Sequence, residues 1–174
     1  VDGLRRLEYR GYDSAGVAVV RDDMTIGLSR TVGKVAELDQ KLAKTPLQGL
    51  IGVAHTRWAT HGGVTEANAH PHVSGGRVAV IHNGIIENFQ PIKDEMLEKG
   101  YVFESETDTE VAAHLIYDYL KQGLDLVEAV GKAVQRFDGA YALLVIDAED
   151  PTRIVVSRVA SPLVIGLGDG ENFV

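Results

Sequence analysis

The sequence predicts an α+β domain in which mainly antiparallel sheets pack against helices. Short hydrophobic runs of strand length are interspersed with segments whose apolar residues recur every three to four positions, as in amphipathic helices. Several connections between these segments are short enough for hairpins, which favours antiparallel pairing. With 174 residues, 45% of them hydrophobic, the chain can bury one substantial core. We therefore expect a single domain over residues 1–174.

The first fifty residues predict two helices and a hairpin of strands. Leucines three apart among charged residues indicate the last turns of a helix, and Gly11 ends that pattern. Two apolar runs around an Arg-Asp-Asp turn indicate paired strands, and apolar residues three and four apart indicate a helix that must end before Pro46. These elements span residues 2–9, 15–20, 24–29 and 35–42.

The second half predicts three further helices followed by three strands. Thr107 and Glu110 have the spacing of a capping box, so a helix should begin there with Asp108 in its first turn. A turn at Asp150 and Pro151 should separate two of the last strands. The helices are expected at 92–99, 107–119 and 126–137, and the strands at 140–147, 153–159 and 163–167.

Reactive side chains gather between two central strands of the chain. One strand precedes Arg57, and the other precedes Asn83 and Gly84, so we expect these residues at strand ends. The intervening segment is long and rich in Gly, Thr, Asn and His, and such loops in compact domains are usually binding or lid elements. The functional site is therefore expected here. The two strands are predicted at residues 50–54 and 77–81.

Composition limits the classes of partner. Lys and Arg number 17 against 25 Asp and Glu, a net charge of -8, which argues against nucleic acid or an anionic membrane surface, because either favours a basic face. The chain contains no cysteine, so disulfides and thiolate metal sites are excluded. No apolar run reaches 18 residues and no signal-peptide pattern occurs, so we expect a cytoplasmic protein.

Five motifs carry a family resemblance: LRRLEYRGYDSAG, HTRWATHG, NAHPH, HNGIIEN and SETDTE. From end to end the chain resembles the glutamine-hydrolysing domain of the glucosamine-6-phosphate synthases, which are N-terminal-nucleophile amidotransferases. The resemblance implies a four-layer αββα sandwich that hydrolyses glutamine to glutamate and ammonia without a metal or other cofactor. It also implies a C-terminal sugar-phosphate isomerase domain that uses the ammonia to make glucosamine 6-phosphate from fructose 6-phosphate. Whether the full enzyme is a homodimer is left open.

The family's nucleophile is an N-terminal cysteine, and this sequence begins at Val1 without one. We therefore expect a domain truncated at both ends, with a cysteine-led strand before Val1 and further strands after Val174. Such a chain is expected to be inactive alone. The missing thiol also leaves room for a glutamine- or glutamate-binding module without catalysis.

The candidate catalytic residues are Asn83, Gly84 and Arg10. Asn83 offers a side-chain amide, and Gly84 a backbone N–H that a ligand can approach closely, as an oxyanion hole requires. Asn-Gly is also the commonest signal of a two-residue hairpin, but the residues after Gly84 lead toward a helix. The resemblance places Arg10 beside the nucleophile, whereas the residues alone favour a solvated cation at a helix end.

The candidate substrate-binding residues recognise the charged groups of glutamine. The planar fork of Arg57 suits the α-carboxylate, and Asp108 complements the ammonium group from a helix N-terminus that favours negative charge. A surface cation and a plain helix-start carboxylate are the alternatives. By resemblance, the loop that folds over glutamine and the pocket beside it contain Trp58, Thr60, His61 and His70. Trp58 suits an ordinary core equally well.

Five of the six histidines lie in the same region, which raises a metal hypothesis. His70 and His72 are two apart, so on a strand they would share a face and, with a third histidine or Asp108, form a zinc site of a hydrolase. Pro71 lies between them and no HExxH motif accompanies them. Hydrogen-bonded histidines near a polar pocket are the alternative, and we favour no metal.

Overall fold

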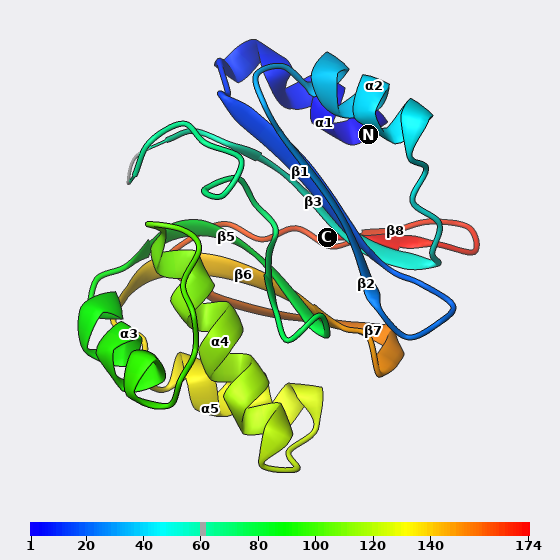
Figure 1. Cartoon of the computed structure of the whole chain (residues 1–174). Coiled ribbons are helices and arrows are strands. Elements are labelled where there is room, and N and C mark those ends of the chain that lie inside the picture. Colours follow the sequence, from blue (N-terminus) through cyan, green and yellow to red (C-terminus); the bar gives the residue numbers. More distant parts are fainter. Residues whose placement is uncertain (60–61) are drawn as a thin grey trace.

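The computed structural model describes residues 1–59 and 62–174, which form four layers (Figure 1). Two helices cover a three-stranded sheet, a four-stranded sheet packs against its other face, and three helices cover the far side of the second sheet. All strand pairs within both sheets are antiparallel. The predicted α+β class and the αββα sandwich are confirmed.

The first helix layer and sheet contain α1 (Asp2–Leu7), the 3-10 turn η1 (Glu8–Arg10), β1 (Ser14–Val20), β2 (Ile26–Val32), α2 (Val35–Lys44) and β3 (Ile51–Arg57). The strand order is β2-β1-β3, so β1 is central. Leu4, Val35 and Leu38 are buried against Ala15 of the sheet. The sheet thus holds the end of β3, with Arg57, at a fixed place over the second sheet.

The second sheet and its helices contain β4 (His72–Ser74), β5 (Val78–Ile86), α3 (Phe89–Glu98), α4 (Asp108–Lys121), α5 (Leu126–Val134), β6 (Gly139–Asp147) and β7 (Asp150–Val159). The strand order is β4-β5-β6-β7, and α4 lies across β4 and β5. A small separate hairpin follows, formed by β8 (Gly166–Leu167) and β9 (Asn172–Phe173).

Two apolar layers hold the sandwich together. Between the sheets, Val53 of β3 packs with Ile81 of β5 and Ile146 of β6. Under the second sheet, Leu115 and Ile116 of α4 are fully buried, and each such side chain contributes roughly 1.5–3 kcal/mol by leaving water. Within the described residues, no helix has the length and apolar character to cross a bilayer.

Strand β5 differs most from its prediction. It does not end at Ile81 but continues to Ile86, because every residue from Val78 onward pairs with β6. Asn83 and Gly84 therefore lie inside a paired strand, so the strand-end prediction is wrong and the alternative of a two-residue hairpin turn does not hold either. The strand is buried as far as His82. Its next three residues, Asn83, Gly84 and Ile85, are exposed, although the strand continues through them.

Gly84 fits this strand only because it lacks a side chain. Its φ is 119°, in the region that favours glycine. A Cβ at this position would lie 2.1 Å from the carbonyl oxygen of Ala140 on β6. The close approach of β5 and β6 therefore requires glycine here.

Some predicted boundaries are also wrong. The second strand of the hairpin begins at Ile26, since Met24 donates its N–H to the Arg21 carbonyl within the turn. Asp150 and Pro151 belong to β7. The last predicted strand shortens to Gly166–Leu167.

The start of α4 is confirmed with Thr107 as its N-cap, but the capping box is not formed. The carboxylate of Glu110 instead accepts hydrogen bonds from the N–H groups of Glu104 and Ser105 and from the Ser105 hydroxyl. The segment before α4 is thus folded back onto its first turn. Asp108 lies in that turn, as predicted.

Candidate active site

A cavity of about 320 Å³ lies where the end of β3 meets β5 of the other sheet. Its volume is at the lower end of the range for small-molecule sites. Five residues selected from the sequence line it: Arg57, Trp58, His70, Asn83 and Gly84. The structure therefore brings together both strand segments singled out by their polar residues.

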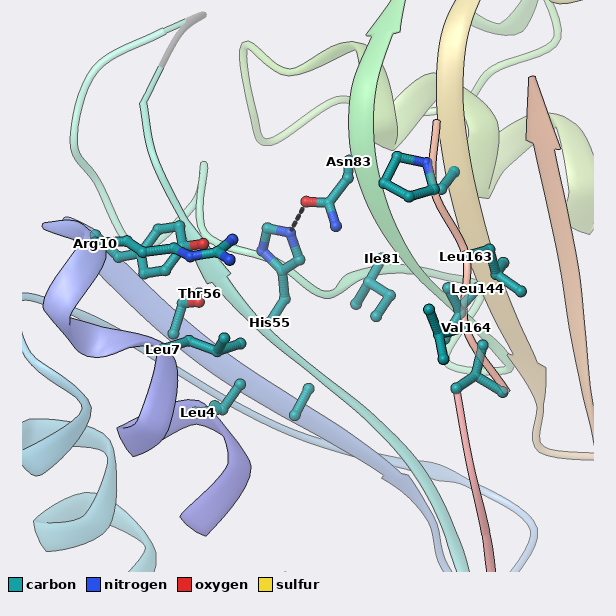
Figure 2. Close-up of a pocket in the computed structure, with 15 residues that line it drawn as sticks. Leu4, Leu7, Arg10, His55, Thr56, Ile81, Asn83, Leu144, Leu163 and Val164 are labelled. Atoms are coloured by element: carbon teal, nitrogen blue, oxygen red, sulfur yellow. Dashed lines mark hydrogen bonds between the residues drawn. The ribbon is translucent and has the colours of Figure 1, made fainter. Parts of the chain in front are cut away.

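Arg10 lines an adjoining cavity of about 310 Å³ (Figure 2). This second cavity shares lining residues with the first: Tyr12, His55, Thr56 and Asn83. Figure 2 shows Arg10 extending from the end of η1 toward the space beside His55. Arg10 is exposed, so it is both a cation at a helix end and a lining residue.

A hydrogen bond between the sheets orients the Asn83 amide. Nε2 of His55 on β3 lies 2.9 Å from Oδ1 of Asn83 on β5 (Figure 2). Burial lowers the pKa of His55 to about 4, so its ring is neutral at pH 7 and carries one N–H. Because Oδ1 only accepts, that proton is on Nε2, and His55 donates. This hydrogen bond uses Oδ1 of Asn83 and neither of its two N–H groups.

Asn83 and Gly84 are both exposed on β5 and line the first cavity. The amide of Asn83 supplies side-chain donors, and Gly84 presents backbone without a side chain. Donors fixed in position before a reaction suit the stabilisation of a developing oxyanion, because they need no reorganisation when charge appears.

Arg57 ends β3 and is 5% exposed. Its Nη1 donates to the carbonyl oxygen of Gly63 at 3.3 Å. A guanidinium carries five N–H donors in a planar fork, and this geometry suits a bidentate pair with a carboxylate. A buried cation lining a cavity favours an anionic group in that cavity.

Trp58 is 64% exposed and lines the first cavity, so the alternative of an ordinary core tryptophan is wrong. It follows Arg57 in the segment that the sequence predicts as a lid. Thr60 and His61, predicted in the same segment, lie outside the described residues.

Asp108 lies beside the first cavity and is not among its lining residues. Its Oδ2 accepts a hydrogen bond of 2.7 Å from the N–H of Ile86, and its Oδ1 lies 3.7 Å from Nδ1 of His82. His82 and Ile85 line the cavity, so this carboxylate lies directly behind these two lining residues. Asp108 thus joins the start of α4 to the end of β5.

The buried histidines are linked through threonine hydroxyls. Oγ1 of Thr109 lies 2.8 Å from Nε2 of His70 and 2.8 Å from Nδ1 of His82. Nε2 of His72 lies 2.9 Å from Oγ1 of Thr107. Burial, reinforced by the neighbouring imidazoles, lowers the pKa of His70 well below its ordinary value.

The rings are also in contact, with centroids 4.5 Å apart for His55 and His70, which are tilted, and 4.8 Å apart for His70 and His72, which meet edge to face. Across residues 1–59 and 62–174, no group of three or more His, Asp or Glu side chains is arranged to hold a metal ion. His55, His70, His72 and His82 instead form hydrogen bonds with Asn83 and the two threonines.

The sequence did not single out Tyr12 and Thr56 of the lining or the bridging Thr109. His55 and His82 entered only through the metal hypothesis. Alternation along β3 gives no signal for Thr56, because it places residue 56 on the face opposite to His55 and Arg57, which line the same cavity. The contacts of Thr109 depend on how α4 crosses β5, which no local pattern gives.

Residues 55–174 match a family model described as a glutamine amidotransferase domain. The chain is 58% identical over 174 residues, 100% of its length, to glutamine–fructose-6-phosphate aminotransferase (isomerizing) of Idiomarina loihiensis. It is 58% identical over 173 residues, 99% of its length, to the enzyme of the same name from Pseudomonas aeruginosa. It spans 28% of the length of each of these relatives.

Among solved structures, the chain is similar to glutamine phosphoribosylpyrophosphate amidotransferase from B. subtilis. The TM-score is 0.72 at 27% identity, over 90% of this chain and 33% of that one. The four layers are thus the sandwich of the N-terminal-nucleophile amidotransferases. Sequence and fold together show that the chain belongs to the glutamine amidotransferase family.

Proposed function

We propose that this chain is the glutamine-hydrolysing domain of an enzyme that converts fructose 6-phosphate to glucosamine 6-phosphate. The observation that carries the proposal is the placement of Arg57 and the Asn83–Gly84 pair in one cavity. These groups suit the carboxylate and the reacting amide of glutamine. The names of the relatives, glutamine–fructose-6-phosphate aminotransferase, support the same substrates.

In the proposed reaction, a thiolate attacks the side-chain amide carbon of glutamine, and the amide oxygen gains negative charge. N–H groups of Asn83 and Gly84 stabilise that oxygen. The C–N bond then breaks, the leaving nitrogen takes a proton and departs as ammonia, and a thioester of glutamate remains. Water attacks the thioester, which releases glutamate and restores the thiol.

The thiol must come from outside these residues, since they include no cysteine. We place it near the adjoining cavity that Arg10 lines, next to Asn83. Arg10 is the third catalytic candidate there, because a nearby cation favours a thiolate over a thiol.

The same proposal assigns substrate recognition to residues on both sides of the first cavity. Arg57 binds the α-carboxylate, Asp108 attracts the ammonium group from behind His82 and Ile85, and Trp58 covers the opening. His70 contributes to the wall. Thr60 and His61 are the remaining substrate-binding candidates of this proposal.

Residues 1–174 form one glutaminase domain in this account. The ammonia passes to a sugar-phosphate isomerase domain in the remainder of the protein, which is consistent with a chain spanning 28% of its relatives. We propose a cytoplasmic enzyme that needs no metal or other cofactor for glutamine hydrolysis. A homodimer of the full enzyme is compatible with this arrangement.

Turnover by the full-length protein tests the proposal. Each glutamine should yield one glutamate and one ammonia, and in the coupled reaction the ammonia should be used up together with an equal amount of fructose 6-phosphate. A second candidate function is glutamine or glutamate binding without catalysis, which requires the charge-binding residues but no cysteine. Calorimetric binding of glutamate without any turnover would establish that second function instead.

A further inference from the structure

Asn68 and Glu106 form a compact hydrogen-bonded pair at the edge of the candidate site. Nδ2 of Asn68 donates to Oε2 of Glu106, and the backbone N–H of Glu106 donates to Oδ1 of Asn68, both at 2.9 Å. Each side chain also holds the backbone of Gly63. Asn68 donates to its carbonyl oxygen and Glu106 accepts from its N–H, again at 2.9 Å.

The pair is a built feature of the fold. Asn68 is 2% exposed, and both its amide donors and its oxygen are used. A Cβ at Gly62, whose φ is 74°, would lie 2.8 Å from both Asn68 and Glu106. The loop at Gly62 and Gly63 therefore rests directly on the two side chains.

Asn68 is itself anchored to the first sheet. Nη1 of Arg30 on β2 donates to the carbonyl oxygens of Ala67 and Ala69, on either side of Asn68, at 3.2 Å each. Arg30 is partly buried at this place. The amide of Asn68 is thus a fixed point to which other segments attach.

The pair joins the two segments that carry the predicted charge-binding residues. The Gly63 carbonyl oxygen that Asn68 binds also accepts from Nη1 of Arg57. On the other side, Glu106 lies two residues before Asp108, which begins α4. One hydrogen-bonded unit therefore touches Arg57 through Gly63 and approaches Asp108 through the backbone.

The attachment includes a charge at neutral pH. The N–H of Gly63 and the amide of Asn68 lower the pKa of Glu106 below its ordinary value. Hydrogen bonds to an ionised acceptor are shorter and stronger than neutral ones. Replacing the carboxylate with an amide therefore weakens the attachment while nearly preserving its shape.

We propose that Asn68 and Glu106 are positioning residues for glutamine, which hold Arg57 and Asp108 at the separation that the two charged groups of one amino acid require. This inference rests on the proposed function of the cavity. It predicts an effect on recognition of the α-amino and α-carboxylate groups, with little effect on the chemistry at the amide.

The test uses the full-length protein with Asn68→Ala, Glu106→Ala and Glu106→Gln. Each variant should raise the glutamine KM, by roughly tenfold for the alanine variants and less for Glu106→Gln, while kcat stays within about threefold. Hydrolysis of glutaramide, which lacks both charged groups, should keep its kcat/KM. Glu106→Gln keeps an exposed side chain of the same size, so it remains informative if Asn68→Ala folds poorly.

A charge swap provides the rescue. Asn68→Asp places two carboxylates together and should raise the glutamine KM, whereas Asn68→Asp combined with Glu106→Gln restores an amide–carboxylate pair. The double variant should therefore recover part of the lost affinity. Failure of the swap to lower KM relative to Asn68→Asp would count against the proposal.

Asn88→Ala is the matched control. Asn88 also ties two segments, donating to the carbonyl oxygen of Arg136 and accepting from the N–H of Asp138, and it lines neither cavity. It should lower the melting temperature without changing the glutamine KM.

If the Asn68 and Glu106 variants behave like Asn88→Ala, or lose activity on glutamine and glutaramide equally, the positioning role is wrong. A wild-type protein without glutaminase activity would overturn the proposed function itself.

Discussion

Nε2 of His55 and Oδ1 of Asn83 are 2.9 Å apart, and this hydrogen bond joins the two sheets beside the candidate active site. A neutral His55 donates in this hydrogen bond, and Oδ1 is the acceptor atom of the Asn83 side chain. The orientation of the Asn83 donors thus depends on a residue of the opposite sheet.

Replacing His55 should therefore impair catalysis more than binding. In the full-length protein, His55→Leu removes the bond that orients Asn83, and kcat should fall roughly five- to tenfold with KM nearly unchanged. Steady-state kinetics check this. His114→Leu is the control, because His114 is also buried but lines neither cavity. It should lower the melting temperature and leave kcat of the folded protein unchanged.

Arg57→Ala and Asp108→Asn should weaken glutamine binding. Each removes the partner of one charged group, and hydrogen bonds to charged groups are worth about 1.5–3 kcal/mol, so KM should rise roughly 10- to 100-fold. Asn at position 108 keeps an oxygen for the N–H of Ile86, which protects the end of β5. Unchanged KM and kcat/KM in both variants would return the two residues to purely structural roles.

Acid should destabilise the fold through its buried histidines. Burial lowers the pKa of His55 to about 4 and that of His72 to about 3, both below the ordinary value of 6.5. At a pH between the lowered pKa and 6.5, each histidine binds a proton in the unfolded chain and none in the folded chain. The free energy of unfolding therefore decreases as pH falls below 6.5. For His55 alone the free energy of unfolding should drop by about 2 kcal/mol between pH 7 and pH 5.

Urea unfolding of the domain at the two pH values measures this difference. His55→Gln should flatten the dependence on pH, since glutamine does not titrate. Equal free energies of unfolding at pH 5 and pH 7 in the unmutated protein would show that the imidazoles are not held neutral.

Gly84→Ala should destabilise the domain strongly. The added methyl group would lie 2.1 Å from the Ala140 carbonyl oxygen in a backbone conformation that alanine avoids. We expect a cost of at least about 2 kcal/mol, read as a lower melting temperature. Gly131→Ala is the matched control. Gly131 lies within α5 with open space around its Cβ position, so alanine there should be neutral or stabilising.

Much of the fold was accessible from the sequence because its signals are local. Periodic apolar residues located the helices around Leu38 and Leu115, and Gly and Pro marked several ends. Arg57 and Asn83 were expected together because each follows an apolar run, and they do line one cavity.

The remaining features depend on contacts between distant segments. The full length of β5 is not visible in the sequence because Asn83 and Gly84 interrupt its apolar run where it faces the cavity, and a local pattern does not separate a cavity from solvent. Glu110 matched a capping box, but its carboxylate is bound by Ser105 and the N–H of Glu104. The role of Thr109 arises only where α4 brings its hydroxyl to two histidines of other segments.

We propose that Asn83 stabilises the oxyanion formed when the glutamine amide is attacked. An oxyanion donor acts mainly after charge has developed, so its loss lowers kcat far more than it weakens binding of the ground state. The most direct measurement is kcat for glutamine in the full-length Asn83→Ala variant, taken together with the melting temperature and glutamate binding.

We predict that kcat falls by roughly 10² to 10³, while glutamate still binds and the melting temperature stays near that of the unmutated protein. A kcat within about threefold of the unmutated value, accompanied by a clear drop in melting temperature, would show instead that Asn83 is a structural residue of β5 and no oxyanion donor.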